Sequence, residues 1–573
     1  MKQRIERVDS IPLIIHWLLE MKVHEIIDRI YMPHSNWQGL SYGQLAVLFV
    51  TYMLHSLSHC LSGMEEWVVQ HKKVIEKVTG WKLGDKEATD DRLSIMMEVL
   101  CEDEDKSVEF QLQIGGHIIQ AHDLPTEIGR YDTTSFNVYH DPENRNKGLL
   151  NFGHSKNYRP DLLQFKQGLG TLDPAGIPLV TETLPGNKAD DGCYLPAWSQ
   201  MAQTIGHTEF LFIADSKAAA LKTRATVDKE KGYYLFPMPM TGDTPEELKR
   251  LVLNPPVEPQ EILLEPLTDE KGEEPRVVGV GFVVEKEMED ETGHRWTERW
   301  IVSRSDAHAE RKKRAFLKRL EKTEERLNKL KAKEEESFES FRARAEKILK
   351  TQNIDNAVSL KVTDSISHIK KYEGKGRPGP NRPYKMIETR TFNLDFERNE
   401  SAIEQSLNLA GWRIYVTNTP ENRLSLNKST RYYRNEWLVE RGFHRLKKGK
   451  IPALPLYLRI PERIKGLMLL LTIALQALTL IEFVARRELA EKNETLQGLV
   501  PGLPKKEIAR PTAERLLARF DNIHLIVEEN EALAIGRVLE PLTPLQNRIL
   551  SLLKIPVYLY ELSFSEPKFQ DSS

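Results

Sequence analysis

Cysteine is scarce in this chain of 573 residues, and its three cysteines, Cys60, Cys101 and Cys193, lie far apart in the sequence. They form no Cys-x-x-Cys pair, which argues against a disulfide framework and against a zinc ribbon. This usage fits a reducing, cytoplasmic compartment. His55 and His59 lie near Cys60, but no second pair of ligands follows at a useful spacing. Packing is therefore the expected role of this trio.

The sequence also lacks an apolar run long enough for a membrane span. Its most apolar stretch, Gly466–Ile481, is closed by Lys465 and Glu482 and falls short of the roughly 20 residues that a span needs. We expect a buried helix there and no membrane partner. The N-terminal 22 residues hold a short apolar run broken by His16, which predicts a helix and not a signal peptide.

No strong net charge marks the chain, because 81 Lys and Arg against 84 Asp and Glu give a formal charge of −3. Nucleic-acid binding would therefore depend on local basic patches. The length predicts roughly three to four domains. We divide the chain into a helical part at 1–120, an α/β part at 121–240, an insertion at 241–425, a second helical part at 426–500 and a small appendage at 501–573.

The α/β part opens with three expected strands in a row. Asp173-Pro-Ala-Gly, a strong turn sequence, joins the second to the third and indicates antiparallel pairing. The expected strands are 128–139, 162–172, 177–186 and 210–215, with helices near 192–205 and 218–229. Asp132 lies in the middle of the first strand, where Asp is disfavoured, and Asp215 ends the fourth. Strand ends of this kind are where sites form in open α/β sheets.

The insertion alternates strand patterns with charged segments. Strands are expected at 276–287, 295–304, 386–396 and 411–418. The Lys-, Arg- and Glu-rich segment 306–350 predicts a long exposed helix or a helical hairpin. Trp296 and Trp300 could stack on an unpaired base or could belong to the core. We favour the core, because the two are alternate residues on one face of the strand. The basic Gly374–Lys385 loop is either a DNA contact or a solvated linker.

A third acidic candidate lies in a helix predicted from Tyr433 to Lys448. At 100° per residue, one face holds Tyr433, Glu436, Glu440 and Lys447, and a second, basic stripe holds Arg441, Arg445 and Lys448. One reading is an ordinary amphipathic helix with solvated charges. However, like charges four residues apart cost a few tenths of a kcal/mol per pair. Their segregation favours a cation on one side of the helix and phosphates on the other.

Asp132, Asp215 and Glu440 together make three carboxylates that face one cleft. Such carboxylates repel one another and depend on cations for compensation. Oxygen ligands suit Mg²⁺ or Mn²⁺. Two such ions about 4 Å apart stabilise the attacking and leaving oxygens of an in-line phosphoryl displacement.

Three motifs in this order carry a family resemblance: YDTTS with Asp132, FIADSKA with Asp215, and Tyr433-x2-Glu436-x3-Glu440-x6-Lys447. The chain resembles the DDE transposases of bacterial insertion sequences, in the branch with a β-rich insertion and a Tyr-Arg-Glu-Lys signature. Glu436 stands at the Arg position of that signature, and Arg434 is the nearest substitute. GHSKNYRPDLLQ, residues 153–164, is also similar to one subgroup, and the resemblance spans about 10–560.

The resemblance implies an α/β fold. Its ribonuclease H-like mixed-sheet core would carry a β-rich and helical insertion and follow an all-α N-terminal domain that binds the element's ends. Asp132, Asp215 and Glu440 would hold two Mg²⁺ ions, with Mn²⁺ as a substitute. Water would then cut the DNA at the element end, and the exposed 3′-OH would attack target DNA. The expected DNA contacts are Tyr433, Arg434, Arg441, Arg445, Lys447, Lys448, Lys156 and Arg159.

The implied partner is double-stranded DNA, bound by a homodimer in the bacterial cytoplasm, at the nucleoid. A catalytically inactive DNA-binding protein of the same fold is one alternative, and the three intact carboxylates argue against it. A stand-alone metal-dependent nuclease is another, which strand transfer of a 3′-OH end would exclude. A structural protein built on segment 306–350 ranks low, because that segment lacks a sustained heptad.

Overall fold

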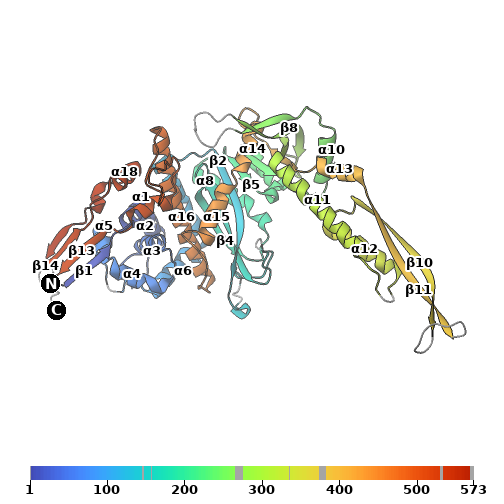
Figure 1. Cartoon of the computed structure of the whole chain (residues 1–573). Coiled ribbons are helices and arrows are strands. Elements are labelled where there is room, and N and C mark those ends of the chain that lie inside the picture. Colours follow the sequence, from blue (N-terminus) through green and yellow to red (C-terminus); the bar gives the residue numbers. More distant parts are fainter. Residues whose placement is uncertain are drawn as a thin grey trace.

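The structure of the chain is a computed structural model that describes residues 2–84, 86–144, 148–155, 158–264, 275–333, 336–372, 383–529 and 533–567. The molecule is elongated, with both termini at one end, a large sheet in the middle, and an arm of helices and a two-stranded ribbon at the other end (Figure 1).

A nine-stranded mixed sheet forms the centre, in the order β4-β3-β2-β5-β6-β12-β9-β8-β7. Its strands are β2 (Ile128–Val138), β3 (Leu163–Leu172), β4 (Ile177–Pro185), β5 (Leu211–Ala214), β6 (Tyr233–Pro237), β7 (Gln260–Leu264), β8 (Arg276–Glu289), β9 (Arg295–Ser305) and β12 (Trp412–Thr417). Strands β2, β5 and β6 run parallel, and the other neighbours are antiparallel. This mixed α/β architecture is consistent with the predicted ribonuclease H-like fold. Strands β7, β8, β9 and β12 extend the same sheet from within residues 241–425.

Helices cover both faces of the sheet around β3. All ten residues of β3 are buried. Leu169 packs against Gly442 of α15 (Trp437–Lys448), whereas Gly170 faces Met201 of α8 (Tyr194–Ile205). Successive strand residues point to opposite faces, so α15 and α8 lie on opposite sides of the sheet.

The N-terminal part contains helices and one strand. Its helices are α1 (Ile11–Glu20), α2 (Val23–Ile30), α3 (Tyr42–Ser56), α4 (Met64–Gln70), α5 (Lys72–Thr79), α6 (Asp90–Glu102) and α7 (Glu104–His122). The predicted all-α domain is not confirmed, because β1 (Lys2–Arg7) forms a strand where we expected helix. It pairs with β13 (His524–Glu529), and buried Glu6 accepts backbone hydrogen bonds from Lys73 and Val74. These long-range contacts have no signature in the local sequence.

The C-terminal segment closes the fold beside the N-terminus (Figure 1). Strand β1 joins β13, β14 (Leu533–Val538) and β15 (Phe564–Pro567) in a second, four-stranded sheet. The helices of this segment are α17 (Ala513–Leu517) and α18 (Pro544–Leu552).

The apolar run near residue 470 lies in α16 (Pro461–Glu491), a helix of 31 residues. By length and composition α16 could cross a membrane, and the bent pair Tyr42–Ser56 and Leu61–Gln70 passes the same test jointly. However, the apolar window of α16 is entirely buried inside the protein, as the sequence predicted. A Cβ at Gly466 would lie 2.3 Å from the carbonyl oxygen of Met97, so glycine permits the close approach of α16 to α6.

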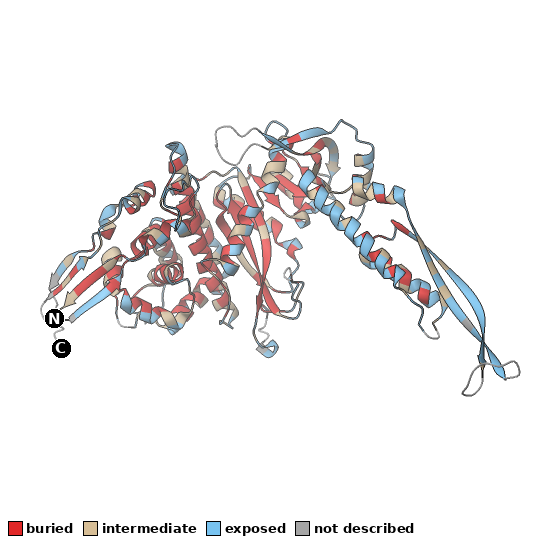
Figure 2. Ribbon diagram, in the orientation of Figure 1, coloured by how far each residue is buried: buried red, intermediate tan, exposed pale blue. Residues whose placement is uncertain are grey.

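The arm contains α11 (Asp306–Asn328), α12 (Phe338–Gln352), β10 (Val358–Tyr372) and β11 (Tyr384–Arg398). The segment 306–350 therefore forms two packed helices, as in the hairpin alternative. A small apolar cluster around Leu320, Ala345 and Leu349 joins the helices to the base of the ribbon. Figure 2 shows that the rest of the ribbon is largely exposed. Most of the Gly374–Lys385 loop lies outside the described residues.

Four further α-helices lie in the described residues: α9 (Leu221–Lys229), α10 (Thr244–Leu253), α13 (Glu400–Asn408) and α14 (Leu426–Arg434). A buried polar network joins α9 and β6 to β9. Glu298 of β9 is fully buried and accepts hydrogen bonds from Arg224 at 2.5 and 2.6 Å, from Tyr234 at 2.6 Å and from Trp300 at 2.8 Å. Trp296 donates to the Tyr234 hydroxyl at 3.0 Å. Both tryptophans therefore belong to the core.

Candidate active site

Asp132 projects from β2 toward α15. It pairs in register with Leu169 of β3, and directly opposed residues of neighbouring strands share one face. Leu169 packs against α15, so the half-buried Asp132 faces that helix too. Its Oδ1 accepts a hydrogen bond of 2.7 Å from the backbone N–H of Thr133. The carboxylate is thus held on a rigid strand.

Asp215 lies immediately beyond β5, next to Asp132. Tyr131 of β2 and Ala214 of β5 are in register, so the two acids occupy the next positions on adjacent parallel strands. Asp215 begins a short 3₁₀ turn, and its Oδ1 accepts hydrogen bonds from the Lys217 N–H at 3.1 Å and from the Tyr194 hydroxyl at 2.5 Å. Tyr194 lies on α8, so this carboxylate is fixed from the opposite side of the sheet.

The helix predicted from Tyr433 onward is broken. Helix α14 (Leu426–Arg434) ends before Asn435, and α15 begins at Trp437, with Glu436 as its N-cap. The N–H of Glu436 bonds back to Tyr433, three residues earlier, which marks a tight turn. The regular 100° spacing therefore does not hold across the break, and the local sequence gives no clear sign of it.

Glu436 lines a small cavity with the two aspartates, and Glu440 lines the cavity next to it. A cavity of about 10 Å³ is lined by Arg130, Tyr131, Asp132, Ile213, Ala214, Asp215, Tyr433, Glu436 and Val439. Glu440 is exposed, one turn further along α15, and lines a neighbouring cavity. Burial, followed by the charges of Asp132, Glu440 and Asp215, raises the pKa of Glu436 to about 7. The four carboxylates thus share one electrostatic field.

Arg130 supplies a buried positive charge beside these acids. It lies two residues before Asp132 on the same face of β2, and its side chain is 2% exposed. Nε and Nη2 donate to Asp173 at 2.7 and 2.8 Å. Within the described part of the chain, Nη1 has no hydrogen-bond partner.

The donor set suits a hard divalent cation, because Asp132, Asp215 and Glu436 present only carboxylate oxygens to one cavity. The cavity volume is close to that of a single water-sized group. Among the residues that the structure describes, no three His, Cys, Asp or Glu side chains already converge closely enough to hold a metal ion. Binding of two ions would therefore require these carboxylates to move.

The predicted DNA-contacting residues fall into two groups. Arg445 is buried and pairs with Glu514 at 2.8 Å and with Glu482 of α16, and Arg441 also pairs with Glu482. These guanidinium groups face the protein interior, which favours a packing role. The carboxylates that bind them lie far along the sequence, so the spacing within α15 could not reveal the contact.

The remaining candidates lie nearer to solvent. Lys448 and Arg434 are exposed, Tyr433 packs its ring against Tyr415 at 4.6 Å, and Lys447 Nζ donates to Thr134 Oγ1 at 2.6 Å. Arg159 is exposed and pairs with Asp161 at 2.6 Å. Lys156 lies outside the described residues.

Four basic residues that the sequence did not single out lie close to this site. Arg304, His308, Arg311 and Arg413 line the neighbouring cavity of about 340 Å³ together with Arg434 and Glu440. They come from the end of β9, the first turns of α11 and the start of β12, and no motif connects them.

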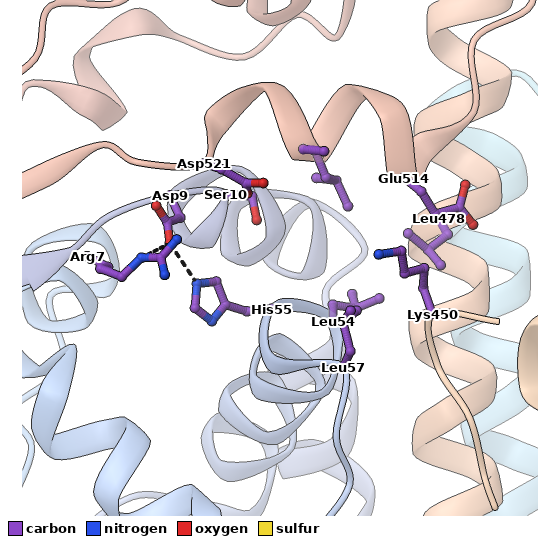
Figure 3. A pocket seen from close by; sticks show the side chains of 12 residues that line it. Arg7, Asp9, Ser10, Leu54, His55, Leu57, Lys450, Leu478, Glu514 and Asp521 are labelled. Atoms are coloured by element: carbon purple, nitrogen blue, oxygen red, sulfur yellow. Dashed lines mark hydrogen bonds and ion pairs between the residues drawn. The ribbon is translucent and has the colours of Figure 1, made fainter. Parts of the chain in front are cut away.

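A separate cavity of about 250 Å³ lies between the N-terminal helices and the C-terminal segment. Figure 3 shows Arg7 and His55 converging on Asp9 there, with N–O distances of 2.7 and 3.2 Å. Trp67 donates to Nδ1 of His55 at 3.0 Å. His55 is thus engaged in contacts within the helical part.

The chain matches the family described as "Transposase DDE domain" over residues 127–476. No curated protein sequence matches the chain. The matched range contains Asp132 on β2, Asp215 just beyond β5, the N-cap residue Glu436 and Glu440 on α15. Because the match covers more than half of the 573 residues, the chain belongs to the family of DDE transposases, which are DNA-cleaving enzymes.

Proposed function

We propose that this transposase cleaves DNA at the ends of an insertion sequence and joins the 3′-OH ends to target DNA. The observation that carries the proposal is the cavity that Asp132 of β2, Asp215 just beyond β5 and Glu436 at the N-terminus of α15 line together. Glu440, which we predicted as the third catalytic carboxylate, lies one turn away and contributes to the same field.

Two Mg²⁺ ions, when bound by these carboxylates, would supply an activated water and stabilise the attacking and leaving oxygens of the phosphoryl transfer. The protein's own groups prepare the site. Tyr194 holds Asp215 by its hydroxyl hydrogen bond, and Arg130 offsets part of the negative charge. Mn²⁺ would substitute, because it shares the preference for carboxylate oxygens.

The proposed partner is double-stranded DNA, first the element ends and then the target. Phosphate contacts from Tyr433, Arg434, Lys447, Lys448 and Arg159 are supported by their position beside the carboxylates or near solvent. We further propose that the helical N-terminal part binds the element ends, that a homodimer brings two ends together, and that the protein acts in the bacterial cytoplasm, at the nucleoid.

A strand-transfer assay tests this proposal. Pre-cleaved duplex carrying the source element's end would be incubated with a supercoiled target plasmid and Mg²⁺, using wild type and Asp132→Asn. Joined products from the wild type alone support a transposase. Cleavage of uncut duplex without any joining would favour a stand-alone nuclease, and DNA binding without cleavage or joining would favour the inactive alternative.

A further inference from the structure

The cavity beside the carboxylates is predominantly basic. Its ionisable lining residues, apart from two tyrosines, are Arg304, His308, Arg311, Arg413, Arg434, Glu436 and Glu440. Four arginines and a histidine thus face two glutamates, both of which lie on the side of α15. The opposite wall, from β9, α11 and β12, contributes only positive side chains among its charged groups.

Most of these cations are uncompensated within the described residues. Arg311, Arg413 and Arg434 are exposed, and in the part of the chain that the structure describes none of the three has a carboxylate oxygen within ion-pair distance. Arg304 pairs weakly with Asp306, at 3.3 Å, and its Nε is buried without a hydrogen-bond partner. Guanidinium groups concentrated in this way repel one another unless an anion lies between them.

The pKa of His308 is affected by the same positive charges. Its pKa is lowered first by burial and then by the charges of Arg413, Lys312 and Arg311. The imidazole is therefore neutral near pH 7, and a bound anion would oppose this shift by offsetting the arginine charges.

The basic cavity adjoins the catalytic one. Tyr433 and Glu436 line both, so the two cavities meet at the break between α14 and α15. A DNA strand with one phosphate at the aspartates would place a neighbouring phosphate within reach of the arginines, whose planar forks match phosphate oxygens.

We propose that Arg304, Arg311, Arg413 and Arg434 form a binding site for a backbone phosphate of the DNA strand next to the phosphate that is cleaved. This site rests on the proposed function. In it, residues at the β9–α11 junction and on β12 would position the DNA strand for cleavage. Its ligand is a DNA phosphodiester. The cavity opens beside the carboxylates, and a site of this kind would hold the strand in register for the attack.

The test measures DNA binding without cleavage. Full-length wild type, the double variant Arg311→Gln/Arg413→Gln and the control Arg326→Gln would bind a labelled duplex carrying the element end, in EDTA, at several salt concentrations. Arg326 is an exposed arginine in the last turn of α11, about 22 Å along the helix from Arg311. Both substituted arginines are exposed, so the double variant is expected to fold, and its thermal unfolding would be compared with wild type.

The double variant should bind about tenfold or more weakly, because charge-assisted hydrogen bonds are lost. The slope of log affinity against log salt should become shallower by about one for each lost phosphate contact, whereas Arg326→Gln changes neither. Unchanged affinity and slope in the double variant would overturn the phosphate site, whether or not the wild type cuts DNA. A reduced slope with a wild type that never cuts in Mg²⁺ would uphold the site and overturn the catalytic proposal. Inorganic phosphate that competes at millimolar concentration would point to a free-anion site instead.

Discussion

Lys447 of α15 donates a 2.6 Å hydrogen bond from Nζ to Oγ1 of Thr134 on β2. Thr134 lies two residues beyond Asp132, on the same face of the strand. This bond ties the C-terminal half of the glutamate helix to the strand of the first aspartate, while Glu436 meets Asp132 at the helix N-terminus. The hydrogen bond thus anchors the C-terminal end of α15 to the strand that carries Asp132.

Replacing Tyr194 by Phe should weaken the site without disturbing the fold. The hydroxyl holds Asp215 Oδ1 at 2.5 Å, and losing an outer partner of a metal ligand typically costs 10–100-fold in metal affinity or activity. We expect a loss of this size in Mg²⁺ affinity, measured by calorimetry, and in DNA cleavage. Tyr558→Phe, a change at an exposed tyrosine of the C-terminal segment, is the control and should have no effect.

Glu436 should make stability depend on pH. Its folded-state pKa of about 7, raised by burial first and then by Asp132, Glu440 and Asp215, exceeds the ordinary glutamate pKa of 4.5. Its stabilising contribution is therefore fully present below pH 4.5 and is lost as the pH rises to about 7, by about 3 kcal/mol in total. In EDTA, the free energy of unfolding of the Glu436→Gln variant should change less with pH over this range than that of wild type. If the free energy of unfolding depended on pH in the same way in wild type and variant, this would contradict the raised pKa of Glu436.

Arg445 should contribute to the stability of the fold, whereas Lys448 should contribute to DNA binding. Arg445→Ala leaves the buried Glu482 with less compensation and should cost about 3 kcal/mol or more in urea unfolding. Lys448→Ala, at an exposed position, should change stability by less than about 0.5 kcal/mol while reducing the salt dependence of DNA binding. The reverse pattern would return Arg445 to the DNA-binding surface.

Glu298 should be essential to the junction between β9 and the core. Glu298→Gln removes the counter-charge of buried Arg224, so we expect a loss of about 3–5 kcal/mol, seen as a lower urea midpoint in tryptophan fluorescence. Glu289→Gln is a matched control on β8, because the Glu289–Arg295 pair is exposed and worth at most about 1 kcal/mol. Equal midpoints for the two variants would show that the network is dispensable.

The strands that carry the aspartates could be predicted because their signals are local. The strand-favouring residues around Asp132 in β2, the turn at Asp173 and the short apolar run of β5 are each short stretches of sequence. Strand β10 was not predicted, since many of its residues are polar and exposed, and its only partner in the described residues is β11.

The position of Glu436 in the cavity of the two aspartates could not be predicted. The expected stripe placed Tyr433, Glu436 and Glu440 on one face, and all three line the basic cavity. Glu436 in addition lines the cavity of the two aspartates, beside a helix break at Asn435 that the sequence did not indicate. Likewise, the basic cavity unites Arg304 with Arg413, which are far apart in the sequence and meet only because β9 pairs with β12. Such contacts depend on tertiary packing.

The most direct test compares Mg²⁺-dependent nicking of a labelled element-end duplex by wild type and four single variants: Asp132→Asn, Asp215→Asn, Glu436→Gln and Glu440→Gln. DNA binding in EDTA would be measured in parallel. We predict that wild type nicks, that both Asp variants bind without nicking, and that Glu436→Gln reduces nicking at least as strongly as Glu440→Gln. Undiminished nicking by Asp132→Asn or Asp215→Asn would contradict the proposal that these aspartates are catalytic.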